Sequence, residues 1–381
     1  MNRFICGAKI LIGIDNLYAE MKDSKKVFVV CDPFIVETNK TACIVEVFDK
    51  LGIEYAIYSN ITPDPSIDLV VEGIKALTEA KPDTIIGFGG GSAIDACKAI
   101  MYIAQKKELV GKQKFIAIPT TSGTGSEVTD FSVITDTAKS VKYPLVSDEL
   151  LPDVAILDAQ FTLTVSPAVT AATGMDVLTH AIEAFVSKNA TDFSDAMAEK
   201  AIRLVRSNLI TAYKSPDDYT ARQEMHNASC MAGIAFNNAG LGLNHGMAHA
   251  MGARFHIPHG KANAVLLPYV MAFNAGCFDN LNDCAKVYAR IARIIHVDSS
   301  SIRQSSLNMI RAVKKFNTQL DIQPDIRSMG ISREDFRDAL DDMALAAYND
   351  KCTATNPREC SVEEIKEVFT HAYFGTRNKK L

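Results

Sequence analysis

The sequence predicts two parts, an α/β domain over residues 1–160 that contains a parallel sheet and an all-helical domain over residues 161–381. As far as about Asp158, short apolar runs that suit strands alternate with longer patterns that suit helices. Beyond Asp158 the apolar residues recur only with a helical period. A chain of 381 residues is also too long for one ordinary hydrophobic core.

Strands are expected where apolar runs end at turn residues. They are a short strand or hairpin within residues 1–14 and strands at 25–31, 55–58, 84–88 and 115–118. Helices are expected where apolar residues recur every three to four positions. They lie near 37–51, 66–79, from 91 onward, 167–187, 193–214, 219–234, 258–275, 279–296, 300–317 and 331–348. Strands that alternate with helices indicate a parallel sheet covered on both faces.

Composition excludes several classes of function. A net charge of −5 gives no reason to expect nucleic acid or an anionic membrane as partner. No apolar run reaches the roughly 18 residues of a membrane span, and the N-terminus lacks a secretory signal. The nine cysteines form no CxxC pair, which favours reduced thiols over a zinc ribbon. We therefore expect a cytoplasmic protein with neither nucleic acid nor membrane as partner.

A glycine-rich turn follows the strand at 84–88, where Gly87-Phe88-Gly89-Gly90-Gly91-Ser92 leads into a helix. Glycines let the backbone approach a ligand closely, and a helix N-terminus offers free N–H groups to a pyrophosphate. The order GxGGGS differs from the dinucleotide fingerprint GxGxxG. The turn therefore indicates a Rossmann-like sheet with a variant glycine turn, and a turn without a ligand is the alternative.

Two further strand ends carry polar residues. Seven small polar or glycine residues follow Pro119, beginning with Thr120 and Thr121. Parallel sheets place ligands at the carboxyl ends of their strands. Asp32 follows the strand at 25–31, and its carboxylate suits ribose hydroxyls. The alternatives are a loop without a ligand and a turn aspartate before Pro33.

Four of the eight histidines lie within fifteen residues, at His245, His249, His256 and His259. Histidine is the commonest metal ligand and a proton carrier near neutral pH. His245 and His249 share a helical face, and Pro258 lets His259 approach from another direction.

A second part of the cluster is Asp176 and His180, which lie four residues apart and share a helix face. Alone they would be a polar stripe, but together with the four histidines they predict a site for one divalent cation. Carboxylate and imidazole ligands suit Fe(II), Zn(II) or another first-row ion. Spacing leaves open which of His249, His256 and His259 completes the site.

Four long motifs of the chain are GFGGGSAIDACKAI, IPTTSGTGSEVT, GMDVLTHAIEAFVS and HGMAHAMGARFHIPHGKANAVLLP. Through them the chain resembles the iron-dependent (group III) alcohol dehydrogenases, from about residue 5 to 370. Within that family the chain resembles the propanol dehydrogenases of bacterial microcompartments that degrade propanediol. The segments that carry this closer resemblance are ITPDP at 61–65, KYPL at 142–145, TGMDVLTH at 173–180, MHNAS at 225–229 and AGLGLNH at 239–245.

The resemblance implies a role for each matching residue. The implied metal ligands are Asp176, His180, His245 and His259. His249 matches the family's histidine close to the nicotinamide that is not a ligand, and it is the implied catalytic residue. His256 is expected in the pocket wall or in a layer behind the ligands. The implied cofactor-binding residues are Asp32, which would repel the extra phosphate of NADP, together with Gly89, Gly90, Gly91, Ser92, Asp95, Thr120, Thr121, Thr129 and Lys142. Asp64 departs from the asparagine of many relatives near the adenine.

The resemblance implies the dehydroquinate synthase-like, iron-containing alcohol dehydrogenase fold and an oxidoreductase that uses NAD(H) and Fe(2+), with Zn(2+) or another divalent ion as alternatives. The implied reaction interconverts a short-chain primary alcohol and its aldehyde by hydride transfer, with the metal as Lewis acid. The favoured direction reduces propionaldehyde or acetaldehyde and regenerates NAD+. Alternatives are a dehydroquinate-synthase-like lyase, a 1,3-propanediol, glycerol or lactaldehyde-type dehydrogenase, and a non-catalytic metal-dependent scaffold.

The surroundings of the protein also follow from the resemblance. It implies a homodimer or larger homo-oligomer that acts on a small alcohol or aldehyde. The resemblance to the microcompartment enzymes further implies that the protein resides inside such a compartment. Its partners would then be the compartment shell or enzymes that produce aldehydes.

Overall fold

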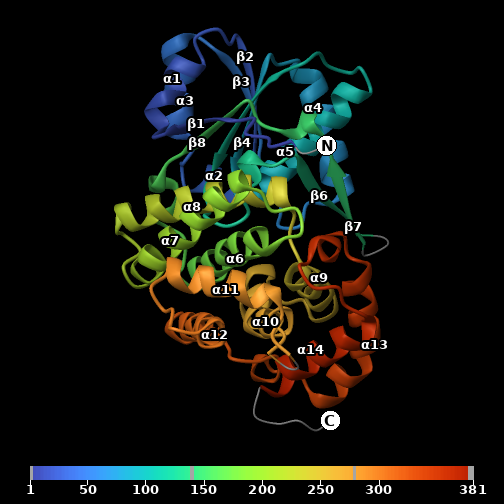
Figure 1. The fold of residues 1–381 in the computed structure, drawn as a ribbon. Helices are drawn as coiled ribbons and strands as arrows, with labels where there is room; N and C mark the ends of the chain where they lie inside the picture. The colour runs from blue at the N-terminus through green and yellow to red at the C-terminus, as the bar shows by residue number, and fades with distance from the viewer. Residues whose placement is uncertain (1–2, 138–140, 278–279, 376–381) are drawn as a thin grey trace. The chain divides into compact units, whose positions relative to one another are not determined.

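The computed structural model describes residues 3–137, 141–277 and 280–375, with residues 141 and 142 described by their backbone alone. Contacts divide the chain into two compact units (Figure 1). One unit comprises Ile5–Thr164, and the other described residues form the second. Each unit is described by itself.

The first unit is built on a six-stranded parallel sheet in the order β1-β8-β5-β4-β2-β3. The strands are β1 (Lys9–Ile12), β2 (Lys26–Cys31), β3 (Glu54–Tyr58), β4 (Thr84–Gly89), β5 (Lys114–Pro119) and β8 (Val154–Leu157). Its helices are α1 (Leu17–Glu20), α2 (Pro33–Glu37), α3 (Ala42–Leu51), α4 (Ile67–Ala80) and α5 (Gly91–Lys106). The parallel sheet confirms the predicted α/β domain.

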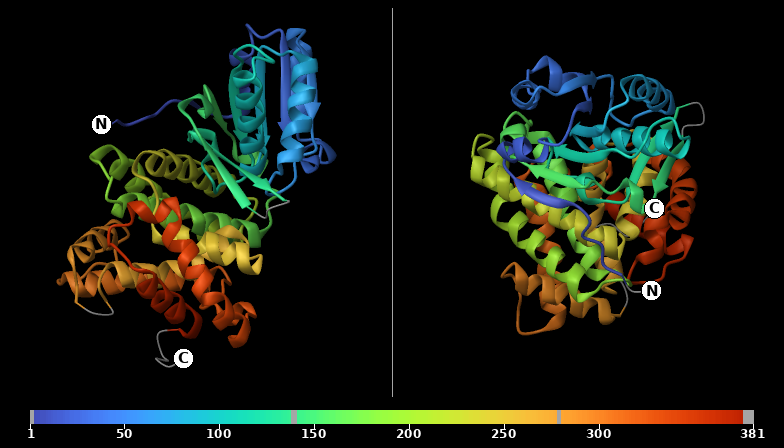
Figure 2. Two further views of the ribbon diagram at one scale, coloured as in Figure 1. Left: turned by 90° about the vertical axis from the view of Figure 1, so that its right-hand side faces the viewer. Right: turned by 90° about the horizontal axis from the view of Figure 1, so that it is seen from above.

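Both faces of the sheet are buried, as the apolar runs predict. Phe28 and Val30 of β2 point into a core with α4 and α5. Val27 and Val29 of the same strand point into the opposite core, which contains residues of α1, α2 and α3. Figure 2 shows these helices on either side of the strands. The alternation follows from the two-residue period of a strand.

Three strand ends meet at one edge of this sheet. β2 ends at Cys31, β4 at Gly89 and β5 at Pro119, and these strands are direct neighbours. The register pairs Cys31 with Phe88 and Gly89 with Pro119. Asp32, the glycine turn and the loop that begins at Thr120 are therefore adjacent, although 55 positions separate Asp32 from Gly87 and 28 separate Ser92 from Thr120.

The strand prediction missed three elements. β6 (Phe131–Asp136) and β7 (Val141–Val146) form an antiparallel pair that contains Pro144, a residue disfavoured inside larger sheets. β8 is only four residues long, too short for a periodic signal, yet it lies between β1 and β5. The helix predicted near 37–51 is broken at Asn39, whose φ of 56° ends α2 before α3 begins.

The second unit is helical over the residues that the structure describes, which confirms its predicted class. Its helices are α6 (Pro167–Val186), α7 (Asp192–Lys214), α8 (Tyr219–Ala239), α9 (Leu243–Phe255), α10 (His259–Asn274), α11 (Asp283–Ile294), α12 (Ile302–Gln319), α13 (Arg333–Asn349) and α14 (Val362–Phe374). α9 and α14 were absent from the predicted set. In the described part of the chain, no helix is both long and apolar enough to cross a membrane.

A buried lysine ties α5 to the loop before β6. Lys98 is fully buried, and its Nζ donates to the carbonyl oxygens of Thr129 at 2.7 Å and Phe131 at 3.0 Å and to the Thr129 hydroxyl at 3.0 Å. Burial lowers the pKa of Lys98 to about 8, although the nearby carboxylates of Asp95 and Glu127 favour its charged form. The ammonium therefore joins α5, the helix that follows the glycine turn, to the end of the loop between β5 and β6.

We expect Lys98→Met to destabilise the first unit by about 3 kcal/mol, because it leaves buried acceptors and carboxylates without their cation. Chemical denaturation followed by circular dichroism measures the change. Lys112→Met, at an exposed lysine of the same unit, is the control and should change stability little. Equal stability of the two variants would contradict this role for Lys98.

Candidate metal centre and cofactor edge

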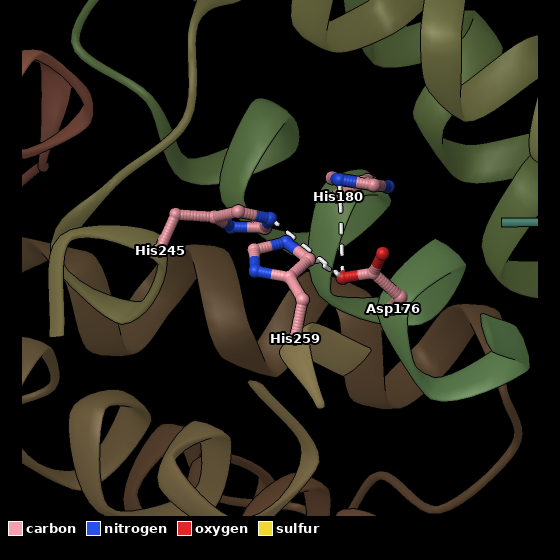
Figure 3. Close-up of side chains that lie close together, drawn as sticks. All are labelled: Asp176, His180, His245 and His259. Atoms are coloured by element: carbon pink, nitrogen blue, oxygen red, sulfur yellow. Dashed lines mark ion pairs between the residues drawn. The ribbon is translucent and has the colours of Figure 1, made fainter. Parts of the chain in front are cut away.

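Four predicted metal ligands converge in the helical unit (Figure 3). Asp176 and His180 lie one turn apart on α6, His245 lies in the first turn of α9, and His259 is the first residue of α10. One ligand atom from each residue lies within 4.8 Å of all the others. The structure thus brings together residues that are up to 83 positions apart in the chain.

Asp176 is at the centre of the cluster. Its Oδ1 lies 3.9 Å from His180 Nε2, 3.7 Å from His245 Nε2 and 3.6 Å from His259 Nε2. The His180 and His245 rings stack with centroids 4.7 Å apart, and Phe236 of α8 packs against His180 at 4.5 Å. Packing therefore fixes the direction in which both Nε2 atoms point.

Glu183, one turn beyond His180 on α6, holds His245. Its Oε2 is hydrogen-bonded to His245 Nδ1, and its Oε1 accepts from the backbone N–H of Asn244 at 2.8 Å. Burial raises the pKa of Glu183 to about 8. Burial, helped by the neighbouring histidines, also lowers the pKa of His245 well below its ordinary value. His245 is therefore a neutral imidazole, and the tautomer with its proton on Nδ1, shared with Glu183, has the lone pair on Nε2 that binds a metal.

Asn263 reaches the same atoms from one turn along α10. Its Nδ2 lies 2.7 Å from Asp176 Oδ1, 3.2 Å from His245 Nε2 and 3.1 Å from His259 Nε2. Its Oδ1 accepts from Asn244 Nδ2 at 2.9 Å, which fixes the amide orientation. The Asn263 amide thus faces three of the four ligand atoms, which shows that these atoms converge on one place.

A tight reversal between α9 and α10 returns His259 to His245. His256 ends α9 in the left-handed conformation, with φ of 54°, and Pro258 precedes α10. His256 is exposed, and its expected place in the pocket wall or behind the ligands stays a prediction. Its backbone makes the turn that places His259.

The residue after His259 sets the approach of α10 to α6. A Cβ on Gly260 would lie 2.3 Å from the carbonyl oxygen of Ala172 and 3.3 Å from Asp176 Cβ. Only glycine fits, because the nearer atom belongs to backbone that cannot rotate away.

The donor set fits a divalent cation. One carboxylate and three imidazoles are the ligands that Fe(II) and Zn(II) accept. Asp176, His180 and His245 are buried, whereas the His259 side chain is 42% exposed. A site open on one side leaves a position for a substrate oxygen, as catalytic metal sites require.

His249 lies beside this cluster on α9. Its ring stacks on His259 with centroids 5.2 Å apart and an interplanar angle of 19°, and its side chain is 43% exposed. Its Nδ1 lies 2.8 Å from Asp350 Oδ2. It is therefore near the four ligand atoms but bonded elsewhere.

At the sheet edge of the first unit, the glycine turn is packed closely. A Cβ on Gly89 would lie 3.0 Å from Asp32 Oδ2, and one on Gly91 would lie 2.6 Å from Thr124 Cγ2. A Cβ on Gly90 would meet Thr121 Oγ1 at 3.5 Å. Gly91 and Ser92 open α5. The predicted pyrophosphate turn, Thr121 and Asp32 are thus neighbours.

Asp32 has a structural duty as well. Its Oδ1 accepts from the backbone N–H of Ile35 at 3.2 Å and caps α2, with Pro33 in the first turn. Burial raises the pKa of Asp32 although backbone N–H groups oppose the shift. The cap and the proximity to Gly89 involve different carboxylate oxygens.

Other predicted cofactor residues are bonded inside the unit. Both oxygens of Asp95 accept hydrogen bonds, from Ser126 Oγ and from the Val133 N–H. Thr129 is fully buried and bonded to Lys98. Thr120 is buried and its N–H donates to the Gly89 oxygen at 2.9 Å. The Lys142 side chain lies outside the described residues. Cofactor contact by these residues stays a prediction.

Comparison with known proteins covers both units. The family model for iron-containing alcohol dehydrogenase matches residues 2–159, and that for the Fe-containing alcohol dehydrogenase family, C-terminal, matches residues 170–373. The chain belongs to the iron-containing alcohol dehydrogenase family. Its members are oxidoreductases, which confirms the resemblance found in the motifs and favours this class over a lyase or a scaffold.

Named relatives of this alcohol dehydrogenase span most of the chain. The 1-propanol dehydrogenase PduQ of Salmonella typhimurium is 41% identical and covers 97% of this chain and 99% of the relative. The NADPH-dependent butanol dehydrogenase of Clostridium saccharobutylicum is 42% identical over 86% of both. Among solved structures, a 1,3-propanediol oxidoreductase has a TM-score of 0.90 at 32% identity and covers 98% of this chain and 100% of its own.

A third solved structure gives the same fold. The iron-containing alcohol dehydrogenase of Thermococcus thioreducens has a TM-score of 0.89 at 35% identity, over 98% of this chain and 100% of its own.

Sequence reasoning missed the residues that orient the ligands of this alcohol dehydrogenase. Glu183 lies seven positions after Asp176, on the same face of α6, and is a carboxylate within an apolar run. Asn263 lies four positions after His259 on α10. Both spacings put a polar side chain on the ligand-bearing face, and this signal could have found them.

We expect Gly260→Ala to weaken metal binding by about 10–100-fold, the range for losing support of a ligand. The new methyl group would move α10 away from α6 and His259 away from Asp176, with every ligand still present. Competition with a chelator of known affinity measures the loss. Gly111→Ala, where a Cβ would meet nothing within 4 Å, is the control. Unchanged affinity in Gly260→Ala would show that the approach of α10 does not set the site.

Proposed function

We propose that this chain is an NAD(H)- and metal-dependent alcohol dehydrogenase that interconverts a short-chain primary alcohol and its aldehyde. The observation that carries the proposal is the convergence of Asp176, His180, His245 and His259, three buried and one exposed. When bound, the cation supplies Lewis-acid polarisation of a substrate oxygen, and the nicotinamide supplies or accepts the hydride.

The protein's own residues bind, orient and move a proton. Glu183 keeps the proton of His245 on Nδ1, so that Nε2 points to the ligand cluster. Asn263 orients Asp176 and His259 from one side. His249, with its ring against His259, is the candidate to move a proton at Nε2, a contribution of about 10²–10⁴-fold for a general acid or base. Iron(II) is the metal that the family name favours, and zinc is the alternative with the same ligand preference.

For the cofactor, the support is the sheet edge formed by the glycine turn, Asp32 and Thr121. Gly89, Gly90, Gly91 and Ser92 are proposed to hold the pyrophosphate at the start of α5. The charge of Asp32 would disfavour the additional phosphate of NADPH. The butanol dehydrogenase relative is NADPH-dependent by name, so similarity alone does not choose between the two cofactors.

For the substrate, the two PduQ relatives, 41% and 42% identical, favour propionaldehyde and 1-propanol, with acetaldehyde next. The resemblance to the propanediol-degrading subfamily is the basis on which we propose cytoplasmic residence inside a microcompartment. We further propose a homodimer or larger homo-oligomer. Anaerobic purification with metal analysis, followed by an aldehyde panel with NADH and NADPH, tests the proposed function. A metal-loaded protein that oxidises neither reduced cofactor with any short aldehyde or diol-derived aldehyde would overturn it.

We expect His259→Ala to lose bound metal and aldehyde reduction together, because it removes one of four ligands. Elemental analysis and NADH oxidation measure the two losses. His256→Asn is the matched control, an exposed histidine three positions earlier whose left-handed backbone asparagine also adopts. Full metal content in His259→Ala would remove this residue from the ligand set.

We expect Asp32→Ser to raise kcat/KM for NADPH by about 10–100-fold, since a like charge facing a phosphate costs several kcal/mol. Serine still accepts the Ile35 N–H and keeps the cap of α2, so the variant removes the charge alone. Steady-state kinetics with both cofactors measure the change, and Asp49→Asn, at an exposed position of α3, is the charge-matched control. If NADPH turnover stays constant, the carboxylate serves only as the cap.

A further inference from the structure

A second group of polar side chains lies beside the candidate metal centre. It consists of His249 on α9 and of Asp350 and Cys352 in the segment after α13, with one polar atom of each within 4.8 Å of the others. The segment is held close to α9, because a Cβ on Gly246 would lie 2.3 Å from Thr353 Oγ1. Thr353 Oγ1 also donates to the Ala347 oxygen at 2.7 Å. The group is therefore built on two elements in firm contact.

Asp350 is the acceptor at the centre of this group. Its Oδ2 lies 2.8 Å from His249 Nδ1, and its Oδ1 accepts from the Cys352 backbone N–H at 2.8 Å. The Cys352 thiol lies within 4.8 Å of the same carboxylate and of the His249 ring nitrogen. Two hydrogen bonds and a neighbouring thiol therefore surround one half-buried carboxylate.

The charge state of the group agrees with this geometry. Burial alone would raise the pKa of Asp350, but the bonds from His249 and Cys352 outweigh it and hold the pKa below its ordinary value. Burial raises the pKa of the Cys352 thiol well above its ordinary value, so the thiol keeps its proton as a donor. The group is thus a carboxylate bonded to an imidazole, with a protonated thiol beside it.

This arrangement decides which nitrogen of His249 carries the proton. A carboxylate at Nδ1 keeps a proton there, and the other nitrogen of a neutral imidazole is then an acceptor. The ring is also held by its stacking on His259. His249 Nε2 is thus the only atom of its ring left to exchange a proton with a reacting group.

We propose that Asp350 is a positioning residue that fixes the tautomer and ring direction of His249, with the Cys352 thiol orienting the Asp350 carboxylate. The inference rests on the proposed function, because it gives His249 a proton-transfer role in alcohol and aldehyde turnover. Asp350 and Cys352 would thus act on a histidine that lies more than 100 positions earlier in the chain.

A cation shared by these three residues is the competing interpretation. The observed contacts favour the hydrogen-bonded group, because His249 Nδ1 and the Cys352 backbone N–H already have the Asp350 carboxylate as their acceptor. A second bound metal is therefore treated as an outcome of the test.

The experiment is a double-mutant cycle on the metal-loaded enzyme. Asp350→Asn keeps the acceptor for the Cys352 N–H but removes the charge that holds the His249 proton. We expect kcat for aldehyde reduction to fall by about 10²-fold or more, with KM within about threefold. In a His249→Ala background the same substitution should lower kcat by less than about threefold, since residues that act as a unit are not additive. An equal loss in both backgrounds would show that Asp350 does not act through His249.

Two matched variants separate positioning from general effects. Asp341→Asn removes an exposed carboxylate of α13 that pairs with Lys366 and should leave kcat unchanged. Cys352→Ala should lower kcat and Cys352→Ser, which restores a donor, should recover it. Failure of serine to rescue would remove the thiol from the proposal.

A readout independent of turnover is the ¹⁵N spectrum of histidine-labelled, zinc-loaded protein. His249 should show a protonated Nδ1 and an unprotonated Nε2 in the wild type, and a mixture in Asp350→Asn. A predominantly Nε2-protonated ring in the wild type overturns the inference whatever the enzyme's substrate. Absence of aldehyde reduction in the wild type would instead overturn the proposed function. Binding of a second zinc ion that Cys352→Ala abolishes would replace the positioning role with a metal site.

Discussion

The contact between the backbones of α6 and α10 is the constraint on which the candidate centre depends. Gly260 lies against the Ala172 carbonyl, and this approach brings the first residue of α10 to the Asp176 carboxylate of α6. His245 and His180 are already stacked within the helical core. The fourth ligand, His259, is therefore placed by main-chain packing. The absence of a side chain at Gly260 is as necessary for the site as the four ligands are.

The chemistry of the site could be predicted from the sequence because its ligands are unusual residue types at helical spacing. Asp176 and His180 share a helix face by their separation of four, and half of the histidines lie in one short stretch. Spacing did not show which of His249, His256 and His259 is the metal ligand. That depends on the left-handed residue at the end of α9, which turns the chain back toward His245. Glu183 and Asp350 were missed for a related reason. Each meets its histidine only after packing, from 62 and 101 positions away.

The sheet edge shows a different limit of sequence reasoning. The carboxyl ends of β2, β4 and β5 are adjacent because these strands are neighbours in the sheet. The alternation of strands and helices predicted a parallel sheet but not the order of its strands. Asp95 and Thr129 lie in motifs full of ligand-like residues, yet their polar atoms bond to Ser126, Val133 and Lys98. Residue type and position along a loop do not show whether a side chain faces outward or holds the loop in place. The β6–β7 pair escaped prediction because its strands pair with each other outside the main sheet.

The unequal burial of the four ligands has a consequence for how an ion would enter and leave. Asp176, His180 and His245 are enclosed by helices, so an ion exchanging with solvent must pass the edge that His259 occupies. Release would begin with loss of that one bond, and rotation of a single imidazole at the start of α10 is a small motion compared with separating helices. The lifetime of the bound ion would then be governed by fraying of one helical turn, while its affinity would be governed by all four ligands. Two enzymes with the same ligands and equal affinity could in this way differ widely in how fast a chelator strips them.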